Sequence, residues 1–452
     1  MNEPPPNDPK ATALAIVQTL VQAGFQTFWA GGCVRDMLMG RPPKDFDIAT
    51  GATPDQVAAL FPKTLDVGKS FGVMQVVADG RPFEVATFRR DISYADGRRP
   101  DSVQFSQPEE DARRRDFTIN GLFYDPVADQ VIDYVEGRKD LAARVVRAIG
   151  DPESRFREDH LRMLRAVRFS AVLGFEIEGR TRKAIRDLAP LLASVSAERI
   201  RDELVRLLTE APKPGQGLVL LREVGLLAVV LPEVDAMAGQ EQPPEFHPEG
   251  DVFTHTAGML DRMEHPTPVL ALAVLLHDVG KPPTAKRVAG PGGKERIRFD
   301  GHASAGAETA QRILQRLRMP LRDIEAVVHC IRNHMRFMDV QKMRRSTLRR
   351  LVGAPTFPAE LELHRVDCLC SHGDLGNYEF LQTFVRELRD EPALPAPWVT
   401  GDDLLALGIP EGPRVGRWLK KAYEAQLEGR FGERETLLAW VKESLAEVDC
   451  EP

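Results

Sequence analysis

The sequence predicts an α/β head with a mixed sheet, followed by a mostly α-helical remainder. Up to about residue 150, short β-branched and aromatic runs alternate with helical segments and glycine turns. Beyond Asp151 the strand signals nearly vanish, and apolar residues recur with helical spacing. We expect five regions: a disordered lead-in with the first helix (1–24), the α/β head (25–150), a helical neck and body (151–245), a histidine-bearing helical domain (246–375) and a helical tail (376–452).

Local signals predict the elements of the head in turn. Helical spacing covers residues 11–23 and stops at Gly24. The apolar residues 28–30 are then expected to form a buried strand that enters the Gly31-Gly32 turn. The other expected elements are a strand in DFDIAT, a helix in TPDQVAALF with Thr53 as its N-cap, and the strands VMQVVA and RPFEVATF joined by a DG turn.

The rest of the chain reads as helices. Four long helical runs are expected at 156–173, 180–193, 196–210 and 214–230. The prolines of EQPPEFHPEG (241–250) then break the chain, and a helical block containing most of the histidines follows at 251–375.

Composition narrows the class of protein. The 452 residues suffice for two to four domains. No apolar run approaches the ~20 residues that a membrane helix needs, so no membrane partner is expected. The polar, proline-rich start is unlike a signal peptide, and the five scattered cysteines suit a reducing compartment, so we expect a cytoplasmic protein. A net charge of -7 leaves nucleic-acid binding open, because the arginines are clustered.

Two aspartates one residue apart stand out in KDFDIAT. Alternate residues of a strand point to one face, so the carboxylates of Asp45 and Asp47 are expected to meet at one spot. Two carboxylates there repel unless a divalent cation lies between them, and hard oxygen ligands suit Mg²⁺. Such a pair can activate a hydroxyl and stabilise leaving pyrophosphate. Upstream, the Gly31-Gly32 turn and the helix starting near Val34 can present N–H groups to phosphate.

Four motifs occur in one order: GGCVRD, KDFDIAT, RRDFTIN and EDHLRMLRAVRF. Over about residues 25–210 the chain resembles the class II tRNA nucleotidyltransferases. This group of the polymerase-β-like superfamily includes CCA-adding enzymes and bacterial poly(A) polymerases. The resemblance implies nucleotide transfer to an RNA 3′ end, with Asp45 and Asp47 as catalytic metal ligands and with Gly32 and Arg35 contacting the triphosphate.

RRDFTIN carries residue types that suit a nucleotide. The Arg115 guanidinium fits phosphate, and Asp116 and Asn120 fit a ribose hydroxyl. Glu84, on the expected strand FEVATF, is either a third carboxylate facing the metals or a partly buried ion-pair partner.

EDHLRMLRAVRF is expected to form one helical face. Asp159 and Arg162 are three residues apart, so they present an acceptor beside a donor, which matches the edge shared by cytosine and adenine. Arg165 and Arg168 continue by threes and can hold phosphates. A plain salt bridge is the alternative, but the family motif implies that Asp159 and Arg162 read the base.

The segment RRDISYADGRRPDSVQF (89–105) is expected to be a long polar loop. Long loops inside compact domains are usually mobile and functional. In the CCA-adding members of the resembled family, a flexible loop here helps to switch specificity from C to A.

The histidine block holds a spread-out set of candidate metal ligands. His255, the His277-Asp278 pair in LLHDVGKP and Asp367 resemble the HD superfamily of metal-dependent phosphohydrolases, and imidazoles with aspartates suit a transition metal. GHAS and RNHM add His302 and His334 to the set. A degenerate domain that only packs and presents RNA is the alternative.

Together, the resemblances imply stepwise addition of C, C and A to tRNA from CTP and ATP. Lys/Arg clusters on the helical half are expected to hold the RNA backbone. A poly(A) polymerase and an enzyme that adds only the terminal A use the same head, although VGKSFGV (67–73) favours CCA addition. The alternative of another class is an HD-type phosphohydrolase with an inert, RNA-binding head, which the Asp45/Asp47 pair disfavours.

Overall fold

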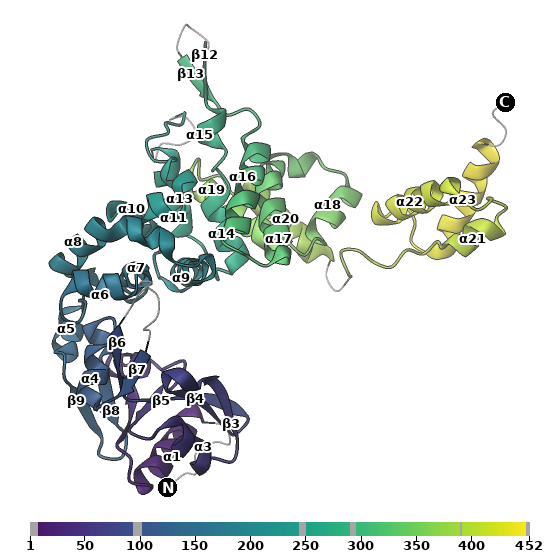
Figure 1. Ribbon diagram of the computed structural model, residues 1–452. Helices are drawn as coiled ribbons and strands as arrows, with labels where there is room; N and C mark the ends of the chain where they lie inside the picture. The colour runs from purple at the N-terminus through teal and green to yellow at the C-terminus, as the bar shows by residue number, and fades with distance from the viewer. Residues whose placement is uncertain (1–7, 94–101, 244–249, 290–294, 389–390, 449–452) are drawn as a thin grey trace. The chain divides into compact units, whose positions relative to one another are not determined.

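The computed structural model describes residues 8–93, 102–243, 250–289, 295–388 and 391–448 (Figure 1). The expected disordered start therefore lies mostly outside the described residues. The chain forms two compact units, residues 1–236 with 316–319 and residues 237–315 with 320–452.

The first unit opens with a seven-stranded mixed sheet in the order β3-β4-β5-β2-β1-β8-β9. β1 pairs antiparallel with β2 and β8, whereas β2 pairs parallel with β5. The strands are β1 (Thr27–Ala30), β2 (Ile48–Thr50), β3 (Thr64–Gly68), β4 (Val73–Ala78), β5 (Arg81–Thr87), β8 (Leu122–Asp125) and β9 (Gln130–Asp133). The helices of the head are α1 (Pro9–Gln22), α2 (Gly32–Leu38), α3 (Pro54–Leu60), α4 (Pro108–Arg113) and α5 (Gly137–Ala143), with 3₁₀ turns η1 (Lys69–Phe71) and η2 (Thr118–Asn120).

The sheet buries both faces through the alternation of its side chains. Trp29 belongs to a core that also contains Ile16 and Leu20 of α1 and Val57 of α3. Its neighbour Phe28 belongs to the core on the opposite face. Figure 1 shows α1 and α3 beside the strands that they cover.

The local signals for turns and caps are confirmed. Thr53 caps α3 through a reciprocal capping box with Gln56. Asp79 and Gly80 have φ angles of 49° and 74°, the left-handed pair that a two-residue hairpin turn between β4 and β5 requires.

Two expectations for the head are wrong. The strand expected in DFDIAT begins only at Ile48, so Asp45 and Asp47 lie in the irregular segment before β2. The segment 89–105, expected to be a loop, instead contains two antiparallel strands, β6 (Arg89–Ser93) and β7 (Ser102–Phe105). They form because the residues on either side of the intervening segment hydrogen-bond to each other. Residues 94–101 of this segment lie outside the described residues.

The rest of the first unit is largely helical. Its elements are α6 (Pro152–Glu158), α7 (Leu161–Leu173), α8 (Gly179–Leu188), η3 (Ala189–Ser194), α9 (Ala197–Glu210), α10 (Pro214–Glu223), α11 (Leu226–Val230) and α12 (Pro232–Asp235), with a short parallel pair of β10 (Val145–Val146) and β11 (Glu176–Ile177). The run expected at 156–173 is interrupted between α6 and α7. The run expected at 214–230 is interrupted by Gly225, whose φ of 77° does not continue a helix.

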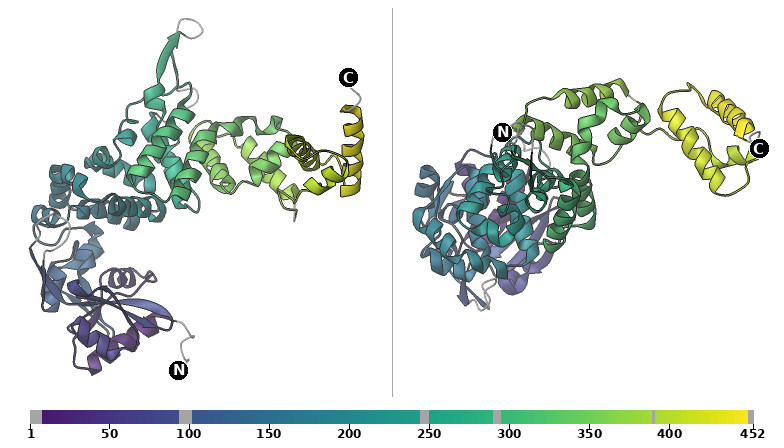
Figure 2. Two further views of the ribbon diagram at one scale, coloured as in Figure 1. Left: turned by 45° about the vertical axis from the view of Figure 1, so that its right-hand side comes forward. Right: turned by 90° about the horizontal axis from the view of Figure 1, so that it is seen from above.

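The described part of the second unit is helical except for a hairpin that helical spacing did not predict. The hairpin pairs β12 (Lys286–Ala289) with β13 (Glu295–Arg298), and it extends from the helices in both Figure 1 and the left view of Figure 2. The helices are α13 (Val252–Leu260), α14 (Pro268–Leu276), α15 (Lys281–Thr284), α16 (His302–Arg316), α17 (Leu321–Asn333), η5 (His334–Lys342), α18 (Arg345–Val352), α19 (Phe357–Cys370), α20 (Gly376–Leu388), α21 (Gly401–Ala406), α22 (Pro413–Leu427) and α23 (Arg434–Val448).

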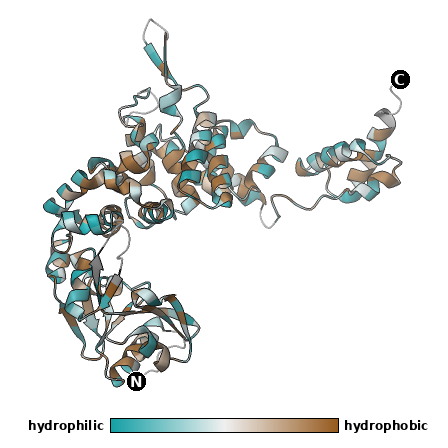
Figure 3. Ribbon diagram, viewed as in Figure 1, coloured by the Kyte–Doolittle hydropathy of each residue, from teal (hydrophilic) through white to brown (hydrophobic). Residues whose placement is uncertain are grey.

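Hydropathy follows burial in this unit. All residues of α14 from Leu270 to Leu276 are buried, and the hairpin strands are coloured largely as hydrophilic in Figure 3. The last three helices have a separate core around Leu404, Trp418 and Leu437. Across the described ranges, no helix is both long and apolar enough to cross a membrane.

Candidate functional site

A polar cavity of about 790 Å³ lies in the first unit. Apart from Glu84, all residues predicted from the sequence to contact the metal or the nucleotide in the head line this one cavity: Gly32, Arg35, Asp45, Asp47, Arg115, Asp116, Asn120, Asp159, Arg162, Arg165 and Arg168. They come from α2, the segment before β2, the segment after α4, η2, α7 and its approach. Their functional roles stay predictions, but their convergence is a structural fact.

Carboxylates gather where the segment 45–47 enters the sheet. The main-chain carbonyl of Asp47 accepts a hydrogen bond from the N–H of Ala30, 2.9 Å away, which fixes this segment beside β1. β2 and β5 run parallel, and Ile48 lies opposite Val85. Asp47 and Glu84, the residues just before these two, therefore stand at matching positions.

Burial, then the charges of Glu84 and Asp45, raises the pKa of Asp47 to about 6, against the opposing effect of Arg115. Two carboxylates that disfavour the ionisation of a third fit a divalent cation, because a cation relieves this repulsion and oxygen is the ligand that Mg²⁺ prefers. Asp45 and Asp47 thus converge without sharing a strand.

The glycine turn ahead of α2 is required by its surroundings. Gly31 has a φ of 73°, and a Cβ on it would lie 2.9 Å from Nη1 of Arg115. Only glycine therefore allows the backbone and this guanidinium to approach so closely.

A chain of buried hydrogen bonds connects the arginines of the cavity. Arg35 donates from Nη1 to Oδ1 of Asn120 at 2.8 Å, and Asn120 donates from Nδ2 to Oδ1 of Asp116 at 3.1 Å. Arg165 donates from Nε to the other oxygen of Asp116 at 2.9 Å. Burial alone would raise the pKa of Asp116, but Arg165 and the hydrogen bonds outweigh it and hold the pKa at about 2. Asp116 is therefore an ionised anchor for the guanidinium.

Glu203 of α9 completes this network. Its carboxylate accepts from Nη1 of Arg165 at 3.2 Å and from Nε of Arg168 at 2.5 Å, and its side chain is 6% exposed. Glu203 was not predicted from the sequence, since it lies 35 or more residues from both arginines and no local spacing connects them. Asp111 was not predicted either, although the i,i+3 and i,i+4 spacing of its pairs with Arg114 and Arg115 is visible in EEDARRRD.

The proposed base-reading pair has a different geometry from the one expected. Asp159 is the residue after α6 with an extended backbone (φ -145°, ψ 105°), and Arg162 lies in the first turn of α7, so they do not share one helical face. Asp159 accepts from Nη2 of Arg199 at 2.8 Å and from the N–H of Leu161 at 3.1 Å. Arg162 donates to Glu158 at 2.6 Å.

Among the described residues, Asp159 and Arg162 form no salt bridge with each other, and each is oriented by its own partner. Both still line the cavity, so a carboxylate and a guanidinium face the same space.

The second unit holds the six histidine and aspartate residues of the HD-like set. They form two groups whose candidate ligand atoms lie within 4.8 Å of one another: His255, His277 and Asp367 in one group, and Asp278, His302 and His334 in the other. The four ligands that the sequence analysis assigned to the metal are thus brought together, with His302 and His334 beside them.

Three of these imidazoles have a fixed orientation. Nδ1 of His277, His302 and His334 lies 2.9, 2.9 and 2.6 Å from the main-chain carbonyl three residues earlier, so each Nδ1 is the protonated donor. The Nε2 atoms then carry lone pairs that face inward, and those of His302 and His334 are only 3.2 Å apart. Nε2 of His277 is buried and lies 3.0 Å from a carboxylate oxygen of Asp278. Inward-facing imidazole nitrogens beside a carboxylate fit a bound cation.

The aspartates of the cluster are ionised. Burial works against ionisation of Asp278, but His277 and Lys281 outweigh it and lower its pKa well below the usual value. Burial, with the charge of His277, lowers the pKa of His334 to about 4, so this imidazole is neutral near pH 7. A neutral imidazole, as in His334, and an ionised carboxylate are the protonation states in which these two side chains bind metals.

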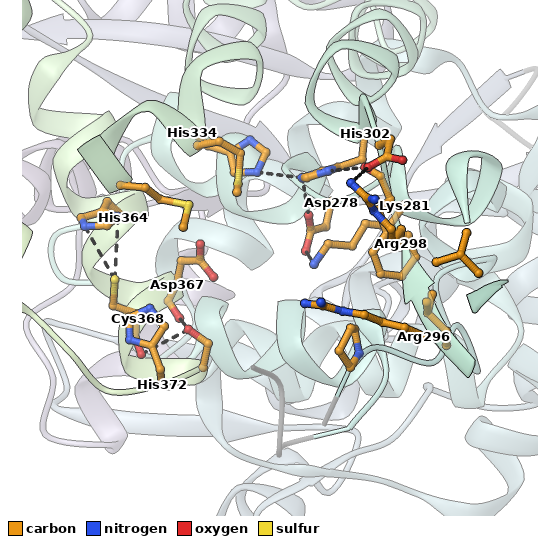
Figure 4. A pocket seen from close by; sticks show the side chains of 18 of the residues that line it. Asp278, Lys281, Arg296, Arg298, His302, His334, His364, Asp367, Cys368 and His372 are labelled. Carbon is orange, nitrogen blue, oxygen red and sulfur yellow. Dashed lines mark hydrogen bonds and ion pairs between the residues drawn. The ribbon is translucent and has the colours of Figure 1, made fainter. Parts of the chain in front are cut away.

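Part of the cluster opens into a cavity of about 630 Å³ (Figure 4). Lys281 lies on its wall, with Nζ 2.6 Å from an oxygen of Asp278 and 2.6 Å from Oε1 of Gln242. The cluster residues that line this cavity are Asp278, His302, His334 and Asp367.

Comparison with known proteins gives three family matches in chain order. Residues 27–147 match the poly A polymerase head domain, 174–237 match the probable RNA and SrmB-binding site of polymerase A, and 252–369 match the HD domain. A CCA-adding enzyme of Geobacillus stearothermophilus is 47% identical over 235 residues, which is 52% of this chain and 57% of that protein. One of Lactobacillus helveticus is 47% identical over 43% of this chain and 49% of its own length. These matches span about half the length of the curated relatives.

Solved structures match over nearly the whole chain. The Bacillus stearothermophilus CCA-adding enzyme in complex with CTP has a TM-score of 0.72 at 30% identity, covering 99% of this chain and 100% of the other. The Thermotoga maritima CCA-adding enzyme complexed with tRNA has a TM-score of 0.59 at 19% identity, covering 98% and 97%, and supports the fold alone.

Proposed function

The chain belongs to the family of the CCA-adding enzymes, and from this membership we propose that it adds CCA to tRNA 3′ ends from CTP and ATP. The observation that carries the proposal is the single cavity in which acidic, arginine and glycine motifs from separate parts of the first unit converge. A tRNA substrate also implies a cytoplasmic location.

In the proposed reaction, the 3′-hydroxyl of the RNA loses its proton to water and its oxygen bonds to the α-phosphorus of the nucleotide, while the bond to the bridging oxygen breaks to release pyrophosphate. Asp45 and Asp47, with Glu84 nearby, would hold Mg²⁺. Bound Mg²⁺ supplies charge stabilisation for the attacking and leaving oxygens. Arg35 and Arg115 are suited to bind and orient the triphosphate through charge-assisted hydrogen bonds.

Base choice is proposed to depend on Asp159 and Arg162. A carboxylate accepts from the amino group that cytosine and adenine share, whereas uracil and guanine would turn a carbonyl oxygen toward it. Arg199 and Glu158 support the proposal, because they hold the two side chains at fixed positions beside the cavity. Arg165 and Arg168, tied to buried carboxylates, are suited to hold phosphate groups or the end of the acceptor RNA.

One experiment separates CCA addition from its nearest alternatives. The protein is incubated with tRNA that lacks CCA, with tRNA ending in C and with tRNA ending in CC, and CTP and ATP are supplied separately. CCA addition predicts incorporation of C on the first two substrates and of A on the third. An enzyme that adds only A would use the third substrate alone, and a poly(A) polymerase would extend all three with ATP.

We further propose that the histidine–aspartate cluster hydrolyses phosphate esters with the help of a bound divalent metal. The facing Nε2 atoms of His302 and His334 carry this second proposal. In the reaction, a water oxygen bonds to phosphorus, the ester P–O bond breaks, and the proton of the water reaches the leaving oxygen. A bound metal would supply the activation of that water.

Metal content tests this second proposal. Purified wild-type protein is expected to bind divalent metal at the cluster, and His277→Ala is expected to lose much of it. His265→Ala, at an exposed position outside the cluster, is the matched control and should keep the wild-type content. Equal metal content in all three proteins would mean that the cluster is only a packing element.

A further inference from the structure

The hairpin β12–β13 carries arginines on both of its faces. Arg296 lies opposite Val288 in the antiparallel register, and Arg287 lies opposite Ile297. Because neighbours in a strand alternate, the Arg296 pair and the Arg287 pair face opposite sides. Arg287 forms ion pairs with Glu241 and Glu295 and is not among the residues that line the cluster's cavity, although its neighbour Ile297 is. Arg296 and Val288 instead line that cavity.

Arg296 thus brings a guanidinium over the histidine–aspartate cluster from outside the helices that form it. Figure 4 shows its side chain reaching into the cavity toward the side of Asp367 and Lys281. A guanidinium is the group best suited to bind phosphate oxygens in a fork, because it presents paired N–H donors in a plane. Arg298, two residues on, also lines the cavity and is ion-paired with Asp300 at 3.0 Å.

The same cavity has an apolar wall. Met335 and Met338 line it and remain 43% and 63% exposed, which is unusual for methionine, and Phe299 lies nearby in the lining. Polarisable sulfur and an aromatic ring suit the flat face of a nucleobase. The volume of about 630 Å³ falls within the usual range for sites that enclose a small organic ligand.

We propose that this cavity binds a nucleoside phosphate, with Arg296 on the phosphate oxygens and the Met335–Met338 wall against the base. Arg296 then selects phosphate-bearing substrates for the cluster. The inference rests on the hydrolytic function proposed above for that cluster, but it concerns binding and can be measured separately. A free mononucleotide and the 3′-terminal nucleotide of an RNA present the same chemistry.

Binding is measured on the full chain by calorimetry, with AMP, adenosine and a short RNA bearing a 3′-phosphate as probes. Arg296→Gln is expected to weaken binding of at least one phosphate-bearing probe about tenfold or more, since a charged hydrogen-bond donor is lost, and to leave adenosine unchanged. Arg287→Gln, on the opposite face of the same hairpin, is the matched control and should bind like the wild type. If Arg296→Gln weakens the binding of AMP, the ligand is a mononucleotide. If it weakens only the binding of the RNA probe, the ligand is an RNA end.

Hydrolysis of the same probes distinguishes the two proposals. A higher KM with little change in kcat for Arg296→Gln supports a binding role. If hydrolysis occurs and is lost in His277→Ala, but Arg296→Gln matches Arg287→Gln in every Kd and KM, the inference is overturned and the hydrolytic function stands. If no probe is hydrolysed with any divalent metal while binding still depends on Arg296, the hydrolytic function fails and the inference stands.

Discussion

Glu203 offers a sharp test of how the head cavity is held in shape. Its carboxylate is the counter-charge of Arg168, whose side chain is only 6% exposed, and it shares Arg165 with Asp116. Glu203→Ala would leave the Arg168 guanidinium buried beside Phe169 without its carboxylate. The change should therefore destabilise the packing of α7 against α9.

Breaking a buried ion pair by removing one partner costs about 3–5 kcal/mol. The lower end applies here, because Arg165 keeps Asp116 when Glu203 is removed. A loss of about 3 kcal/mol corresponds to roughly a hundredfold change in the opening equilibrium. Glu203→Gln keeps one acceptor of the same size and should cost about 1.5–3 kcal/mol.

Hydrogen exchange followed by mass spectrometry measures this locally, which matters because a chain of two units need not unfold in one step. Amides of α7 and α9 should exchange about a hundredfold faster in Glu203→Ala. Glu210→Ala is the matched control on the same helix, since its pair with Lys44 is largely exposed and worth 0–1 kcal/mol. Equal exchange in the two variants would refute the view that Glu203 anchors the arginines.

The remaining predictions concern the same cavity. Asp47→Asn should abolish nucleotide incorporation at unchanged Mg²⁺ with a wild-type circular dichroism spectrum, and near-normal transfer would exclude the metal role. Asp116 has its pKa lowered to about 2 on folding, so it contributes on the order of 2 kcal/mol above pH 4 that is lost as the pH falls toward 2. Asp116→Asn should flatten the acid limb of the stability curve, and an unchanged slope would contradict this. Arg199→Gln should loosen Asp159 and raise incorporation of UTP or GTP relative to CTP and ATP by about 5- to 100-fold (roughly 1–3 kcal/mol), by analogy with side-chain readout of bases. If the ratio stays at the wild-type value, base choice lies elsewhere. Gly31→Ala should weaken CTP binding, because its Cβ meets the Arg115 guanidinium at 2.9 Å, and an unchanged KM would argue against this close approach.

Local chemistry in the sequence was sufficient for the turns and caps of the head. The DG turn between β4 and β5 and the Thr53 N-cap depend only on residues within three or four positions, and both were predicted. The strand expected at Asp45 and Asp47 failed because period-two spacing is also compatible with an irregular segment. The structure pairs only Ile48 onward with β1 and β5.

Long-range partners explain the other differences. No proline or glycine marks the break between α6 and α7, and Asp159 is held in its extended conformation by Arg199, 40 residues away. Glu203 was likewise invisible without the fold. By contrast, the histidine set was found from its sequence order, whereas the inward orientation of the Nε2 atoms of His277, His302 and His334 depends on main-chain carbonyls that only the folded backbone places.

The head cavity shows why its arginines do not make the protein basic. Arg115 is matched by Asp111, Arg165 by Asp116 and Arg168 by Glu203, while the whole chain carries a net charge of -7. Each carboxylate fixes a guanidinium before any nucleotide arrives, so less side-chain freedom is lost on binding. As a consequence, one buried carboxylate supports both the stability of the fold and the position of an arginine in the cavity. Replacing an anchor such as Glu203 should therefore raise the KM for nucleotide together with the loss of stability, whereas replacing Asp47 should affect catalysis alone.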